Sequence, residues 1–160
     1  MPSAPVTGHE RRSPTPAALR KRDAIRRLKK AVAEERLELR YQPIVRAGDG
    51  LAAGVEALLK WRAAEAEEDS LTDLIWVAER SPVIFQLENW ILERAFGEAA
   101  TLPATLRVNV NLSAREFSRA DLGRRLARRL RAARLEPARI GLEITETSAM
   151  HDLEEVAGQL

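Results

Sequence analysis

The chain has 160 residues, of which 45% are hydrophobic and 31% are charged, so it is long enough for one domain with a real core and too apolar for wholesale disorder. It has no cysteine and only two histidines, which excludes disulfides, thiolate chemistry, Cys-ligated metal sites and a His-rich metal cage. The formal net charge of +2 argues against a wholly basic nucleic-acid binder, and no segment has the apolar run of a secretory signal or membrane span, so we expect a cytoplasmic protein without membrane contact.

The first part of the chain divides into a tail and a helix. Residues 1–15 are rich in Pro, Ser, Thr and Arg, which is typical of a disordered tail or the stub of a linker. Residues 16–35 place Leu19, Ile25 and Leu28 at helical spacings among charged residues, which predicts an amphipathic helix. We therefore expect one folded domain over residues 16–160.

A strand pair is predicted next. In residues 37–45, LELRYQPIV, apolar and polar side chains alternate, which indicates a strand. The turn RAGDG joins it to a second predicted strand, residues 51–61, and so short a turn favours an antiparallel hairpin. An acidic loop, AAEAEEDS, then precedes a short predicted helix over residues 73–79 and a longer one over residues 85–99.

The last part of the chain alternates strands with helices. The patterns LRVNVNLS, residues 106–113, and RIGLEITET, residues 139–147, predict strands, with a helix between them over residues 119–134 and another beginning near residue 152. Strands separated by helical segments are typical of parallel β-α-β units. The predicted fold class is therefore α/β.

One face of three predicted strands carries oxygen-bearing or charged side chains, namely Glu56, Lys60, Asn109, Asn111, Ser113 and Glu143. Most lie near the carboxyl ends of their strands, where the chemistry of a barrel is assembled. Carboxylate and carboxamide oxygens are hard ligands that suit Mg²⁺, Mn²⁺ or Ca²⁺ rather than zinc or copper. A purely structural role, in which these groups bond one another and nearby backbone, stays open at this point.

Four segments in order resemble one family. They are YQPIV at residues 41–45, GVEALLKW at residues 54–61, VNLS at residues 110–113 and LEITET at residues 142–147. With these motifs the chain, from about residue 24 to its last residue, resembles the EAL domain of bacterial cyclic di-GMP phosphodiesterases. The resemblance implies a TIM-like (β/α) barrel whose first strand is antiparallel to its neighbour, and metal-dependent hydrolysis of cyclic di-GMP to the linear dinucleotide.

The resemblance also implies roles for particular residues. Glu56, Asn111 and Glu143 match the family's ligands for a catalytic Mg²⁺ or Mn²⁺. Glu146 matches the glutamate that supports a later catalytic loop, and Gln42 matches the glutamine that contacts the dinucleotide. Such metal ions lower the pKa of an attacking water and neutralise charge on phosphoryl oxygens.

Three departures from the family pattern bear on activity. Lys60 stands where the family usually has an arginine that reaches a ligand phosphate, so the charge is kept but the bidentate fork is lost. The loop after Trp61 is acidic, and the family's later Asp-Asp motif has no match before Leu160. We therefore expect a truncated EAL-like domain, about half a barrel, that is inactive by itself.

Two alternatives remain. The chain could be a non-catalytic module that binds cyclic di-GMP or another protein, such as a second copy of itself or another signalling domain of EAL or GGDEF type. A nucleic-acid role for the arginine-rich segment RRLARRLRAARL is not favoured, because no aromatic residues interleave with the arginines.

Overall fold

The computed structural model describes residues 15–62 and 71–144. The elements, in chain order, are α1 (Pro16–Ala33), β1 (Leu37–Val45), β2 (Ala52–Trp61), α2 (Leu71–Glu79), α3 (Val83–Ala99), β3 (Arg107–Leu112), α4 (Ala114–Phe117), α5 (Leu122–Ala133), a 3₁₀ turn (Pro137–Arg139) and β4 (Ile140–Ile144). The fold is α/β, as predicted, and within these residues no helix has the length and apolar character needed to span a bilayer.

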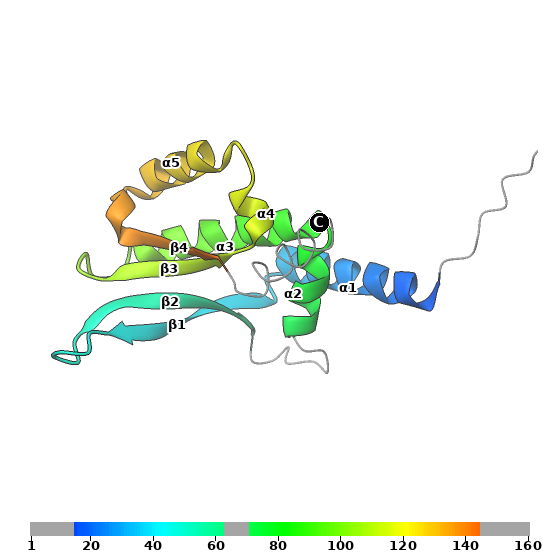
Figure 1. The fold of residues 1–160 in the computed structure, drawn as a ribbon, viewed down its shortest axis with the longest axis horizontal. Coiled ribbons are helices and arrows are strands. Elements are labelled where there is room, and N and C mark those ends of the chain that lie inside the picture. Colours follow the sequence, from blue (N-terminus) through cyan, green and yellow to red (C-terminus); the bar gives the residue numbers. More distant parts are fainter. Residues whose placement is uncertain (1–14, 63–70, 145–160) are drawn as a thin grey trace, which may run out of the picture.

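The strands form one sheet in the order β1-β2-β3-β4 (Figure 1). β1 and β2 pair in antiparallel fashion, with a register irregularity near the turn between Ile44 and Val45, whereas β2, β3 and β4 are parallel. The antiparallel hairpin and the parallel β-α-β units predicted from the sequence are thus confirmed. Within the described residues, β1 and β4 each have one neighbouring strand, so the sheet is open at both edges.

A glycine allows β2 and β3 to approach closely. Gly54 is paired with Arg107 across the two strands, and a Cβ atom at Gly54 would lie 2.6 Å from the carbonyl oxygen of Arg107. Any larger residue would push this backbone away, because real Cβ contacts are never so short. The close approach of β2 and β3 at this pair therefore requires glycine at position 54.

Helices cover one face of the sheet, with α3 running alongside β3 and α5 lying beyond it (Figure 1). The core lies between this face and the helices, and its fully buried members include Leu37, Val108, Val110, Leu92 and Phe96. Burial alternates along β3, where Val108, Val110 and Leu112 are buried and the residues between them are not. The opposite face of the sheet therefore carries the polar side chains of each strand.

The boundaries predicted from the sequence hold to within a few residues, and the structure adds the short helix α4 and the 3₁₀ turn Pro137–Arg139. The segment after β3 forms the short helix α4, capped by the Ser113 side chain, which accepts a hydrogen bond from Glu116 N at 3.3 Å. This turn delays the start of α5 to Leu122 rather than residue 119. The predictions for the N-terminal tail, the acidic loop, the last helix and Glu146 lie outside the described residues.

Candidate metal and phosphate site

The open face of the sheet brings together four polar side chains from three adjacent strands. Glu56 on β2 is the register partner of Asn109 on β3, and Asn111 on β3 is the register partner of Glu143 on β4. Side chains two residues apart on a strand share a face, so Asn109 and Asn111 point the same way. The three predicted metal ligands, Glu56, Asn111 and Glu143, are therefore on neighbouring strands of one face.

Hydrogen bonds in this group run diagonally across the strands. Asn111 Nδ2 donates to Glu56 Oε1 at 2.6 Å, and Asn109 Nδ2 donates to Glu143 Oε1 at 2.5 Å. Each carboxylate is thus held by a carboxamide from β3, and each asparagine bonds the acid that is not its direct register partner. We call these four residues the inner-face cluster.

The inner-face cluster holds two carboxylates without a cation. No ion pair to Glu56 or Glu143 forms among residues 15–62 and 71–144, and the same residues contain no group of three or more His, Asp or Glu side chains that could bind a metal by themselves. The donor set consists instead of two carboxylates and two carboxamides. Carboxylate groups that share a site without a counter-charge favour binding of a cation.

These residues fit a hard divalent cation. Carboxylate and carboxamide oxygens are the donors that Mg²⁺ and Mn²⁺ prefer. The carboxamides use their N–H groups on the two glutamates, which leaves the Asn111 oxygen and the second oxygen of each carboxylate without a hydrogen bond to another described residue. Asn109 differs, because its Oδ1 is buried and lacks a hydrogen-bond partner.

The two residues predicted to bind the substrate lie on β1 and β2. Gln42 on β1 is the direct register partner of Glu56, so the two side chains share a face, and Gln42 is exposed. Lys60, near the carboxyl end of β2, is also exposed and lines a cavity of about 620 Å³ together with Asn111, Ser113 and Glu143. Lys60 is the one basic residue of β2 and follows Glu56 by four positions.

Ser113 does not join the inner-face cluster, although the sequence pattern placed it with the asparagines. It follows the last residue of β3 and is buried, and its backbone N–H donates to Glu88 Oε1 on α3 at 2.5 Å. Burial raises the pKa of Glu88 to about 7, while the Ser113 hydrogen bond opposes this rise. Glu88 Oε2 is buried without a hydrogen-bond partner.

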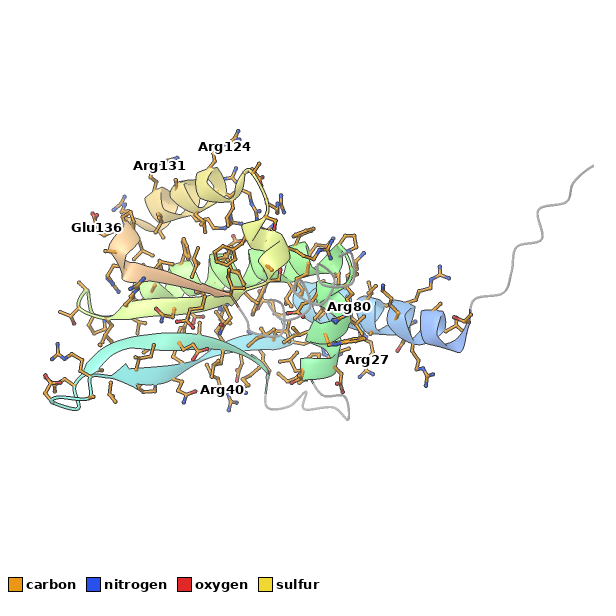
Figure 2. The ribbon with its side chains drawn as sticks, in the orientation of Figure 1. Arg27, Arg40, Arg80, Arg124, Arg131 and Glu136 are labelled. Carbon is orange, nitrogen blue, oxygen red and sulfur yellow. The ribbon has the colours of Figure 1, made fainter. Side chains whose placement is uncertain are left out.

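The arginines of α5 are divided between two environments. Arg125 and Arg129 face inward, where both donate to Asn89 Oδ1, at 2.5 and 2.8 Å, and Arg125 also forms an ion pair with the buried Glu116 at 2.5 Å. Arg124 and Arg131 point away from the molecule (Figure 2). Part of the arginine-rich pattern therefore serves the packing of α5 rather than a ligand.

The sequence analysis predicted three of the four members of the inner-face cluster as metal ligands and did not assign a role to Asn109. It also missed Glu88 and Glu116. The only signal for Asn109 was its alternation with the buried valines of β3. For Glu88 and Glu116 the sequence offers no pattern, since single acids on helices are ordinarily exposed.

Comparison with known families and proteins adds to this geometry. The family model described as EAL domain matches residues 25–160. A signalling protein of Caulobacter vibrioides without a characterised function is 34% identical over 140 residues, which are 88% of this chain and 17% of that protein. The bifunctional diguanylate cyclase/cyclic di-GMP phosphodiesterase MucR of Pseudomonas aeruginosa is 34% identical over 129 residues, 78% of this chain and 19% of MucR.

Solved structures show the same arrangement. The MucR phosphodiesterase in complex with cyclic di-GMP matches with a TM-score of 0.71 and 32% identity, over 83% of this chain and 56% of that chain. An EAL enzyme in a form bound to cAMP and cyclic di-GMP matches with a TM-score of 0.75 and 25% identity, over 85% of this chain and 39% of that chain. The described sheet thus corresponds to part of an EAL barrel, and the chain spans less than a fifth of the length of these two curated relatives.

Proposed function

Because this chain belongs to the EAL domain family, we propose that the open face of its sheet is the N-terminal part of a cyclic di-GMP site of the metal-dependent phosphodiesterase type. The observation that carries the proposal is the inner-face cluster, in which Glu56 and Glu143 lie on one face without a cation partner among the described residues. The relatives named as cyclic di-GMP phosphodiesterases, and the solved complex of MucR with cyclic di-GMP, support the choice of ligand.

Glu56, Asn111 and Glu143 would hold a divalent cation, for which Mg²⁺ and Mn²⁺ are the candidates. When bound, such an ion supplies charge neutralisation at the phosphodiester and lowers the pKa of an attacking water. The chain itself supplies orientation, since Asn111 fixes one carboxylate oxygen of Glu56 through a 2.6 Å hydrogen bond. Glu146, expected from the family motif to support a later loop, keeps that role as part of the proposal.

Gln42 and Lys60 are proposed to bind the dinucleotide. Each phosphodiester of cyclic di-GMP carries one negative charge, and Lys60 offers a cation at the rim of the cavity that Asn111 and Glu143 also line. A lysine contributes a point charge but not the planar fork of an arginine, so the paired, directional hydrogen bonds of a bidentate phosphate contact are lost. Gln42, exposed beside Glu56, can donate and accept hydrogen bonds at a nucleobase or phosphate.

We further propose that the 160-residue polypeptide, tested by itself, binds cyclic di-GMP but hydrolyses it slowly or not at all. The family's Asp-Asp motif is not among its residues, and the only aspartate after Glu146 is Asp152. A non-catalytic binding module is the second candidate, and the observation that favours it is Lys60 in place of the family's arginine. The proposed protein partners are a second copy of the chain or another signalling domain of EAL or GGDEF type.

The test is a calorimetric titration of the full chain with cyclic di-GMP in the presence and absence of Mn²⁺, with linear dinucleotide followed by chromatography. We expect metal-dependent binding that is weakened by about tenfold or more in Glu56→Gln. Glu136→Gln should leave the affinity unchanged, because Glu136 is an exposed acid outside the inner-face cluster. Equal affinity of all three proteins would contradict the proposed site. Turnover by the purified chain, lost in Glu56→Gln, would replace the binding role by catalysis, and a steep dependence on chain concentration would assign the missing groups to a second copy.

A further inference from the structure

The inner-face cluster contains one residue to which the family resemblance gives no role. Asn109 lies on β3, two residues before the proposed ligand Asn111, and its Nδ2 donates to Glu143 Oε1 at 2.5 Å. Its register partner on β4 is Gly141, not Glu143, so the side chain reaches along β4 toward the acid. Asn109 is therefore placed to orient Glu143, while Asn111 bonds Glu56 on the other neighbouring strand.

A glycine on β4 makes room for this contact. A Cβ atom at Gly141 would overlap Asn109 Oδ1 and would lie 3.0 Å from Arg107 Nε. Any side chain at this position would thus displace the carboxamide of Asn109, because no real Cβ atom approaches an oxygen that closely. The backbone of Gly141 does not adopt a left-handed conformation, so the need for glycine here comes from the neighbouring side chain. Glycine at position 141 thus leaves the space that the Asn109 carboxamide occupies.

The position of Asn109 has a cost that its hydrogen bond to Glu143 offsets. Asn109 Oδ1 is buried against β4 and has no hydrogen-bond partner, and a buried acceptor without a partner is unfavourable. The amide hydrogens, in contrast, are directed at a carboxylate, and hydrogen bonds to a charged acceptor are stronger than neutral ones. The orientation of the amide is therefore determined by Glu143.

We propose that Asn109 is a positioning residue that fixes the orientation of the Glu143 carboxylate, and that Gly141 is the partner that allows it to do so. The expected effect on metal affinity rests on the proposed function, whereas the hydrogen bond between Asn109 and Glu143 does not. Residues that hydrogen-bond a metal ligand orient it, and their removal usually weakens metal affinity by roughly 10–100-fold. Asn109 orients the Glu143 carboxylate by a hydrogen bond, as Asn111 orients that of Glu56, but Asn109 is not itself a proposed ligand.

The first experiment measures Mn²⁺ affinity of the full chain by the loss of the free-ion signal in electron paramagnetic resonance. We expect Asn109→Ala to weaken Mn²⁺ binding by roughly 10-fold or more, and Gly141→Ala to weaken it similarly. In the Asn109→Ala background, Gly141→Ala should add less than about a twofold change, because the side chain that it displaces is already gone. Fully additive effects of the two changes would overturn the inference.

The matched control is Asn89→Ala on α3. It removes a carboxamide that accepts two hydrogen bonds from Arg125 and Arg129, so it perturbs the fold without touching the inner-face cluster. We expect it to leave Mn²⁺ affinity within about twofold of the unchanged chain, because the two sites share no partners. An Asn109→Ala variant that binds Mn²⁺ as tightly as Asn89→Ala would overturn the positioning role.

The second experiment works without metal and keeps the inference separate from the proposed function. A double-mutant cycle of Asn109→Ala and Glu143→Ala, followed by urea unfolding in a chelator, measures the coupling of the two side chains. We expect the combined change in the unfolding constant to depart from the product of the single changes by about twofold or more. If the unchanged chain binds no Mn²⁺, the proposed function fails, and this cycle decides the inference: a departure supports it and a simple product overturns it.

Discussion

Acidic residues on the two sides of the sheet have different kinds of partners. On the helix-covered face, buried Glu116 is paired with Arg125 at 2.5 Å and Arg119 at 3.6 Å. On the open face, Glu56 and Glu143 are bonded by carboxamides and by no cation among the described residues. The carboxylates of both groups accept hydrogen bonds, but among the described residues only Glu116 has arginine partners that balance its charge.

The difference indicates what each group does. A charge that is buried for structural reasons is compensated within the fold, because an uncompensated one costs several kcal/mol. Glu88 follows the same rule by a different route, since burial raises its pKa to about 7 and thereby favours the neutral acid. Glu56 and Glu143 accept hydrogen bonds from neutral carboxamides and have no cation partner among the described residues, as the proposed site for an external cation requires.

The largest effect is expected at the compensated group. Glu116→Ala removes a fully buried carboxylate and leaves Arg125, whose side chain is 12% exposed, with a 3.9 Å ion pair to Asp121 in place of its 2.5 Å pair to Glu116. Breaking such a pair from one side should lower the free energy of unfolding by about 3 kcal/mol. Urea unfolding measures this, with the exposed Glu136→Ala as a control that should change it by less than about 0.5 kcal/mol. Similar losses of unfolding free energy in Glu116→Ala and Glu136→Ala would show that the ion pairs of Glu116 do not stabilise the fold.

A pH-dependent effect of intermediate size is expected at Glu88. Its pKa is about 7 in the folded chain against 4.5 for an ordinary glutamate, so between these values the folded state binds more protons than the unfolded state. The contribution of Glu88 is therefore complete below about pH 4.5 and is lost as the pH rises through about 7, with a slope of up to about 1.4 kcal/mol per pH unit.

The Glu88→Gln variant isolates this contribution. The introduced carboxamide would retain an acceptor for the Ser113 N–H but would not titrate. The difference in unfolding free energy between the unchanged chain and the variant should shift in favour of the variant as the pH rises from about 5 to about 8. A difference that stays constant across this range would show that Glu88 titrates normally.

The smallest effect on stability is expected at the uncompensated group. Glu56→Gln and Glu143→Gln each keep an oxygen that accepts the asparagine N–H and remove a charge that no described cation balances. In metal-free buffer each change should alter the free energy of unfolding by less than about 0.5 kcal/mol, or raise it slightly. A loss as large as that of Glu116→Ala would mean that these carboxylates have a structural role.

The sequence predicted the elements well where a local pattern decides them. Alternation and a short turn located the β1–β2 hairpin, and the apolar stripes located α1, α3 and α5 to within a few residues. The motif residues Glu56, Asn111 and Glu143 were predicted to lie on one face, and they do.

Features that depend on register or on packing between distant segments were not predictable. The diagonal bond from Asn109 to Glu143 requires the exact alignment of β3 and β4, and the space over Gly141 is visible only once these strands are paired. Ser113 was wrongly grouped with the asparagines, because alternation along a strand does not show where the strand ends and a helix cap begins. Burial of Glu88 likewise arises from the fold, since its place on α3 resembles that of any polar helical residue.

The central claim is that the inner-face cluster is a divalent metal site, and thermal unfolding with and without Mn²⁺ tests it most directly. A ligand that binds only the folded chain stabilises it by about 2.7 kcal/mol at a hundredfold excess over its dissociation constant, which for a chain of this size is a rise in Tm of about 5 °C or more. We predict this rise for the unchanged chain and for Glu136→Gln, and little or none for Glu56→Gln and Glu143→Gln. An equal rise in all four proteins, or none in the unchanged chain, would contradict the account.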